Sequence, residues 1–189
     1  MRCPPWVRCR RAPERGRPWR AGSAGRAGAR GVRAVQHHDP GAALADGLEE
    51  ADPHDTDRIL AAAAGTLDLS RPTALVLSGT LGHVGDHAEA RSVADRLMAG
   101  LPSGSHLSVN DGSRGTDPEY ERAQDACDGT GAVPYFLRPV ENIEGFFAGL
   151  EPVPPGVVPV PLWRPEPAAE GAAGAPRPIG RHGGPGRKP

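Results

Sequence analysis

Several residue types are scarce in this sequence, and each scarcity limits what the chain can be. Three cysteines (Cys3, Cys9 and Cys127) are too few and too scattered for a disulfide framework. No apolar run reaches 18 residues, which argues against a membrane-spanning helix. The pair Arg10 and Arg11 has no apolar segment after it, so we expect no secretory signal. These absences favour a reduced, cytoplasmic protein without a membrane partner.

Lysine is also rare, and the basic residues are unevenly distributed. Lys188 is the sole lysine among 22 basic residues, and isoleucine and asparagine are almost absent, as is typical of a GC-rich coding sequence. Residues 1–34 carry ten arginines against one acid, a charge of +9, whereas residues 35–176 carry eight arginines against 22 acids, a charge of -14. Residues 177–189 add +4, so the net charge of -1 hides a basic start on an acidic body.

The basic start has no periodic apolar pattern. Such a segment buries too little apolar surface to offset the entropy lost on ordering, so we predict a disordered arginine-rich arm at 1–34. Trp6 and Trp19 would be available to stack on bases if the arm bound nucleic acid. A stretch translated from a wrong start or reading frame is a third interpretation. We expect disorder rather than nucleic-acid binding, because the body behind the arm is acidic.

The organising stretch of the chain is residues 73–86. Its first half, 74–77, is continuously apolar and lies between Pro72 and Ser78, which fits a strand that is covered on both faces in a parallel sheet. Small residues and His83 follow, and Asp86 opens a helix. Because ligands of open α/β sheets bind at the carboxyl ends of the strands, we expect a site directly after this strand.

The remaining pattern alternates helices and strands. The spacing of apolar and capping residues predicts helices at 56–67, 86–99, 117–127 and 140–149, and strands at 73–78 and 105–110. This order predicts an α/β fold in which the two strands are adjacent and parallel.

The ends of this body are less regular. Residues 35–40 fit the end of a strand and 42–50 a short helix. Histidines and aspartates gather between 37 and 55, but without the cysteine spacing of a structural zinc site, so we expect solvated histidines and no metal. Prolines restrict 150–163 to edge strands or extended loop. Residues 167–178 form a Pro/Ala/Gly linker, and 179–189 a last segment at the sheet edge.

Several segments resemble class I S-adenosylmethionine-dependent methyltransferases common in high-GC bacteria. They include L-D-L-S-R-P at 67–72, L-V-L-S-G-T-L-G-H-V at 75–84, V-N-D-G at 109–112, G-A-V-P-Y at 131–135 and G-R-K-P at 186–189, in family order. The resemblance covers residues 55–189 and implies a partial Rossmann-like sheet, S-adenosyl-L-methionine as cofactor and a methyl acceptor that the sequence does not identify.

The front of the chain departs from that family. The family has a strand leading into a glycine-rich loop for the methionyl group, then a second strand ending in an acid that holds the ribose. Here the glycines at 22–31 are spaced among arginines, and His37 stands where the ribose-binding acid belongs. We therefore expect a truncated methyltransferase-like domain at 35–166, with an open edge on its central strand through which copies could associate.

The resemblance also implies roles for individual residues. Asp52 would contact the adenine amino group, Ser78 and Gly79 the cofactor, and Asn110 and Asp111 the acceptor side. His83 would be the general base, because a histidine exchanges protons near neutral pH; the alternative is a hydrogen-bonding residue of the loop.

Three functions remain open from the sequence. The first is a methyltransferase-like protein that is impaired because the glycine-rich loop is missing. The second is a non-catalytic remnant or interaction module, and the third an arginine-rich nucleic-acid binder.

Overall fold

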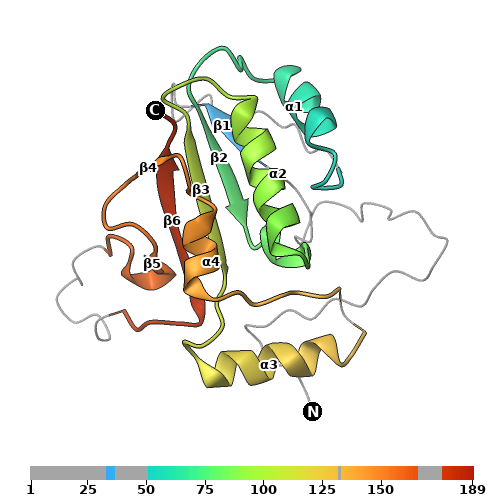
Figure 1. Cartoon of the computed structure of the whole chain (residues 1–189), viewed down its shortest axis with the longest axis vertical. Coiled ribbons are helices and arrows are strands. Elements are labelled where there is room, and N and C mark those ends of the chain that lie inside the picture. The colour runs from blue at the N-terminus through green and yellow to red at the C-terminus, as the bar shows by residue number, and fades with distance from the viewer. Residues whose placement is uncertain (1–32, 37–50, 132, 166–175) are drawn as a thin grey trace.

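The computed structural model describes residues 51–131, 133–165 and 176–189, together with the backbone of 33–36 (Figure 1). The predicted helix at 42–50, His37 and nearly all of the predicted arm at 1–34 lie outside these residues. So does most of the predicted linker at 167–178.

Within the described residues, six strands form one mixed sheet in the order β1-β2-β3-β6-β4, and β5 also pairs with β6. The strands are β1 (Arg33–Gln36), β2 (Thr73–Ser78), β3 (His106–Gly112), β4 (Glu151–Pro152), β5 (Val158–Pro159) and β6 (Arg181–Arg187). β2 and β3 are adjacent and parallel, which confirms that prediction, and every other pairing is antiparallel.

The helices lie close to their predicted positions. They are α1 (Thr56–Ala64), α2 (His87–Ala99), α3 (Pro118–Asp128) and α4 (Val140–Gly145), with 3-10 turns η1 (Leu81–His83) and η2 (Val160–Leu162). Side chains of Asp55, Asp86 and Asp117 accept hydrogen bonds from the first turns of α1, α2 and α3. None of these described helices has the length and apolar character needed to cross a membrane.

α4 is shorter than predicted. The sequence pattern predicted a helix to residue 149, but α4 ends at Gly145. The amides of Phe146 and Phe147 bond to carbonyls three residues earlier, at 3.3 and 3.0 Å, so the chain continues in tighter turns. This conformation still buries both phenylalanines in the core.

The core lies between one face of the sheet and helices α2 and α4, which both stand in front of the strands in Figure 1. Alternation along the strands turns Leu75 and Leu77 of β2, and Leu107 and Val109 of β3, toward these helices. Side chains on the other face of β2, at 74 and 76, are half-buried rather than fully covered, unlike the strand predicted to be buried on both faces.

Two features at the margins of the sheet correct the sequence predictions. β1 pairs along β2, in register from Arg33 with Val76 to Gln36 with Thr73, so the predicted open edge of the central strand is occupied. β1 also includes the last two residues of the predicted arm.

The carboxyl-terminal strand is the second correction, because β6 lies between β3 and β4 instead of at an edge. Pro185 is tolerated there since its carbonyl, which faces β4, accepts a hydrogen bond from the Val153 amide at 3.1 Å just beyond that short strand. The absent donor of the proline therefore interrupts no pairing with β3. Gly183 allows close contact as well: a Cβ there would lie 2.4 Å from the Val109 carbonyl.

The fully buried Leu77 provides a test of this core. Replacing Leu77 by Ala is expected to lower the free energy of unfolding by roughly 2–5 kcal/mol, because a cavity would open between β2 and α2. Leu162→Ala, at a side chain that is 37% exposed, is the matched control and should change it by less than about 1 kcal/mol. Urea denaturation followed by circular dichroism measures both; similar values for the two variants would contradict the packing described here.

Candidate functional site

The carboxyl ends of β2 and β3 bring three of the predicted site residues together. Ser78 lies opposite Asn110 in the parallel register. The side-chain amide of Asn110 donates to the Ser78 Oγ at 3.0 Å. The backbone amide of Gly79 donates to the backbone carbonyl of Asn110 at 2.8 Å. Gly79 has a φ of 65°, a left-handed conformation that favours glycine and turns the chain out of the strand.

His83 lies in the loop that follows, at the end of η1, and its side chain is exposed. Its Nδ1 lies 2.8 Å from the carbonyl oxygen of Pro134. A carbonyl only accepts hydrogen bonds, so Nδ1 carries the proton of the neutral ring and Nε2 retains a lone pair. No residue in the described part of the chain hydrogen-bonds to Nε2, which leaves this nitrogen able to accept a proton.

Asp111 occupies a different position from its neighbour Asn110. The sequence pattern ended the strand before Asp111, but β3 continues to Gly112, and strand alternation therefore turns Asp111 to the same face as Val109. Its side chain has no exposed surface. The expected acceptor-side contact thus does not match the place of this carboxylate, which is buried and points to the face opposite Asn110.

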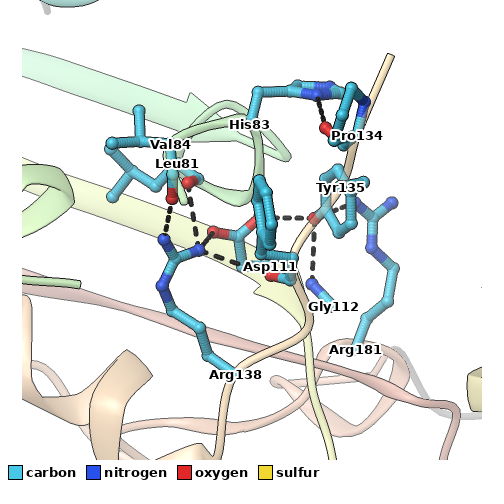
Figure 2. Close-up of polar contacts among 10 residues, drawn as sticks. Leu81, His83, Val84, Asp111, Gly112, Pro134, Tyr135, Arg138 and Arg181 are labelled. Carbon is cyan, nitrogen blue, oxygen red and sulfur yellow. Dashed lines mark hydrogen bonds and ion pairs between the residues drawn. The ribbon is translucent and has the colours of Figure 1, made fainter. Parts of the chain in front are cut away.

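Figure 2 shows that Tyr135 and Arg138 surround the buried carboxylate. The Tyr135 hydroxyl donates to Asp111 Oδ1, while Oδ2 lies 3.9 Å from Arg138 Nη1. Burial raises the pKa of the Asp111 carboxyl, and the Tyr135 hydrogen bond and the arginine charges oppose that shift only in part. The pKa of Tyr135 is raised by its own burial and by Asp111, so its hydroxyl remains protonated and can donate.

Arg138 joins this centre to the loop that carries His83. Its guanidinium is almost fully buried and donates to the carbonyls of Leu81, at 3.0 Å, and of Val84. The Phe136 amide adds a hydrogen bond of 2.7 Å to the carbonyl of Gly82. Residues 133–138 are therefore hydrogen-bonded along η1. The same segment is bonded to the end of β3 through Tyr135.

Asp52 lies on a separate segment, before α1. Its Oδ1 accepts from the ring nitrogen Nδ1 of His54 at 2.6 Å, and His54 Nε2 lies 3.4 Å from Glu89 in the first turn of α2. Asp52 is thus linked to the start of α2 through His54, and its side chain is 68% exposed.

Comparison with known proteins shows which family the chain belongs to. The sequence profile of a family described as S-adenosyl methyltransferase matches residues 32–189. The chain belongs to this family. The membership confirms the resemblance seen in the sequence, and with it S-adenosylmethionine as the cofactor of the family.

Two solved structures show the same fold. A DUF574-family protein from Streptomyces avermitilis is 36% identical, with a TM-score of 0.66 over 75% of this chain and 54% of that one. A proposed methyltransferase from Thermobifida fusca is 28% identical, with a TM-score of 0.60 over 73% of this chain and 52% of that one. The chain therefore spans about half the length of these similar structures. No curated protein matched the sequence.

The described residues fit S-adenosylmethionine only in part. Asp52 offers an exposed carboxylate for an adenine amino group, but Ser78 and Asn110 are hydrogen-bonded to each other. The face of Gly79 is filled as well, since a Cβ there would lie 2.9 Å from the Arg181 guanidinium. β1 runs antiparallel to β2, so its carboxyl end lies at the opposite end of the sheet from this site. The described residues thus supply neither a further strand that ends at this site nor an open glycine turn for the methionyl group.

The sequence reasoning did not identify Tyr135, Arg138 and Arg181. Tyr135 belongs to the G-A-V-P-Y segment that carried part of the family resemblance, and this was the one signal available for it. Arg138 and Arg181 have no such signal, because their partners are carbonyls and a hydroxyl that lie far away in the sequence.

Arg138 gives a second test. Arg138→Met removes the donors to Leu81 and Val84 and leaves Asp111 buried without its neighbouring cation, so we expect a loss of about 3–5 kcal/mol in the free energy of unfolding. Arg164→Met removes an exposed guanidinium that also donates to a carbonyl and should cost less than about 1 kcal/mol. Thermal and urea unfolding compare the two; equal losses would contradict the structural role of Arg138.

His182 predicts a pH dependence of stability. It is buried beside Ser113, whose Oγ lies 2.8 Å from His182 Nδ1, and burial lowers the pKa of His182 below its ordinary 6.5, partly opposed by Glu144. The neutral ring stabilises the fold above about pH 6.5, and this contribution declines as the pH falls toward the lowered pKa, at no more than about 1.4 kcal/mol per pH unit.

The comparison for this prediction is His182→Gln, which cannot be protonated. Urea unfolding between pH 7.5 and 5 should show a smaller loss of stability on acidification in the variant than in the wild type. Equal losses over this range would show that His182 does not contribute.

Proposed function

We propose that this chain carries the acceptor side of an S-adenosylmethionine-dependent methyltransferase, with His83 as the general base, and that its own residues hold the cofactor weakly. The observation that carries the proposal is the arrangement of His83: Nδ1 is bonded to a carbonyl while Nε2 faces no described partner. The base lies in the loop that follows β2, whose parallel neighbour is β3, and open α/β sheets bind ligands at such strand ends.

The acceptor chemistry follows from these residues. Nε2 of His83 takes the proton from an O–H or N–H group of the acceptor, and the ring becomes an imidazolium. The Pro134 carbonyl accepts from Nδ1–H and favours the positive charge that develops. Ser78 and Asn110 add a hydroxyl and an amide that can exchange their mutual hydrogen bond for bonds to a polar acceptor. The acceptor is thus a molecule with an ionisable oxygen or nitrogen.

Weak cofactor binding follows from the fit. Two charge-assisted hydrogen bonds, to the methionyl carboxylate and to the ribose, have no donor or acceptor among the described residues at the end of β2. At about 1.5–3 kcal/mol each, their loss weakens binding by roughly two to four orders of magnitude. The antiparallel β1 also favours a second function, a non-catalytic interaction module that keeps the family fold without turnover.

Calorimetric titration with S-adenosylmethionine tests the cofactor prediction. Relative to low-micromolar binding, a loss of two to four orders of magnitude gives a dissociation constant above about 0.1 mM. Low-micromolar binding to this chain would contradict it. A titration that shows no binding heat at millimolar cofactor would favour the interaction module.

Asp52 offers a matched comparison for any residual binding. Asp52→Asn should weaken it by about tenfold or more, because a charged acceptor for the adenine amino group is lost. Asp95→Asn, at an exposed carboxylate of α2 paired with Arg91, should leave it unchanged. Chemical-shift changes in NMR spectra titrated with the cofactor measure both. An unchanged affinity in Asp52→Asn would remove Asp52 from the site.

A further inference from the structure

The Tyr135 side chain is a meeting point of four segments. Its hydroxyl donates to Asp111 of β3, accepts from the Gly112 amide at 3.0 Å and lies 3.3 Å from the Arg181 guanidinium of β6. Its ring and the ring of His83 pack edge to face, with 5.1 Å between centroids and an interplanar angle of 84°. Figure 2 shows this hydroxyl between the carboxylate on one side and the arginine on the other.

The ring of Tyr135 also lies directly on the backbone of η1. A Cβ on Gly82 would be 2.3 Å from the ring, so this close approach requires glycine at the residue before His83. Such contact fixes the ring from a second direction. Because both its polar end and its face are held, Tyr135 has little freedom to rotate.

The residue before Tyr135 supplies the hydrogen bond that sets the tautomer of His83. The carbonyl of Pro134 accepts from His83 Nδ1, and it belongs to the peptide unit that ends at the Tyr135 amide nitrogen. Holding Tyr135 therefore holds this carbonyl. The carbonyl selects the ring tautomer because it can only accept.

We infer that Tyr135 is the positioning residue for His83: it holds the Pro134 carbonyl and the ring edge so that His83 carries its proton on Nδ1 and presents Nε2 as the acceptor. The biological meaning of this arrangement rests on the proposed function, in which Nε2 is the base. The tautomer itself is a property of the folded chain, and it is measured without cofactor or acceptor.

NMR of ¹⁵N-labelled chain decides the tautomer through the imidazole nitrogen shifts of His83. In the wild type, Nδ1 should carry the proton. Tyr135→Phe keeps the ring and removes the hydroxyl that bonds to Asp111 and Gly112, and the fraction of His83 with its proton on Nε2 should rise at least about tenfold, equivalent to about 1.4 kcal/mol. Gly82→Ala, which displaces the ring from the other side, should give a change in the same direction.

The control is Thr130→Val, which also deletes a hydroxyl, one that bonds to the Cys127 carbonyl at 2.7 Å at the end of α3. It should leave the His83 signals unchanged. A wild type with its proton on Nε2 overturns the inference without any variant. So does a folded Tyr135→Phe chain with the wild-type tautomer. A chain that binds no cofactor still gives this answer, which separates failure of the inference from failure of the proposed function.

Discussion

The buried carboxylate of Asp111 is the constraint on which the rest of the site depends. Removing a carboxylate from water costs on the order of several kcal/mol unless hydrogen bonds and opposite charge offset it. Here the Tyr135 hydroxyl bonds to one oxygen and the Arg138 guanidinium lies 3.9 Å from the other. Arg138 then uses its remaining donors on the carbonyls of η1. The contacts of one buried carboxyl group thus tie β3, η1 and residues 133–138 into a single unit.

That unit places His83 at the surface without using His83 to hold the fold. The loop is held by Arg138 and Tyr135, and the histidine adds an edge-to-face ring contact and one hydrogen bond to a carbonyl. Nε2 therefore belongs to an exposed side chain whose loop is held by buried hydrogen bonds. Binding residues are commonly arranged in this way, on loops that a packed scaffold positions.

Family membership rests on both sequence and fold. The profile match extends over residues 32–189 and the fold agrees with two solved structures, so the ancestry is methyltransferase. Among the described residues, β1 runs antiparallel to β2, so its carboxyl end lies at the opposite end of the sheet from Ser78.

The sequence by itself determined the parallel pair β2 and β3 and the capped helices, because these depend on local periodicity and capping. The family followed from its resemblance to short segments such as G-A-V-P-Y at 131–135. Only the tertiary structure decided that β6 lies inside the sheet, since its neighbours are distant in the chain and its glycines and proline predicted an edge. The tertiary structure also decided where the Asp111 side chain lies. The sequence pattern ended this strand at residue 110, whereas β3 extends two residues further. The alternation of side chains then turns the Asp111 carboxylate into the core, where Tyr135 and Arg138 from another segment contact it.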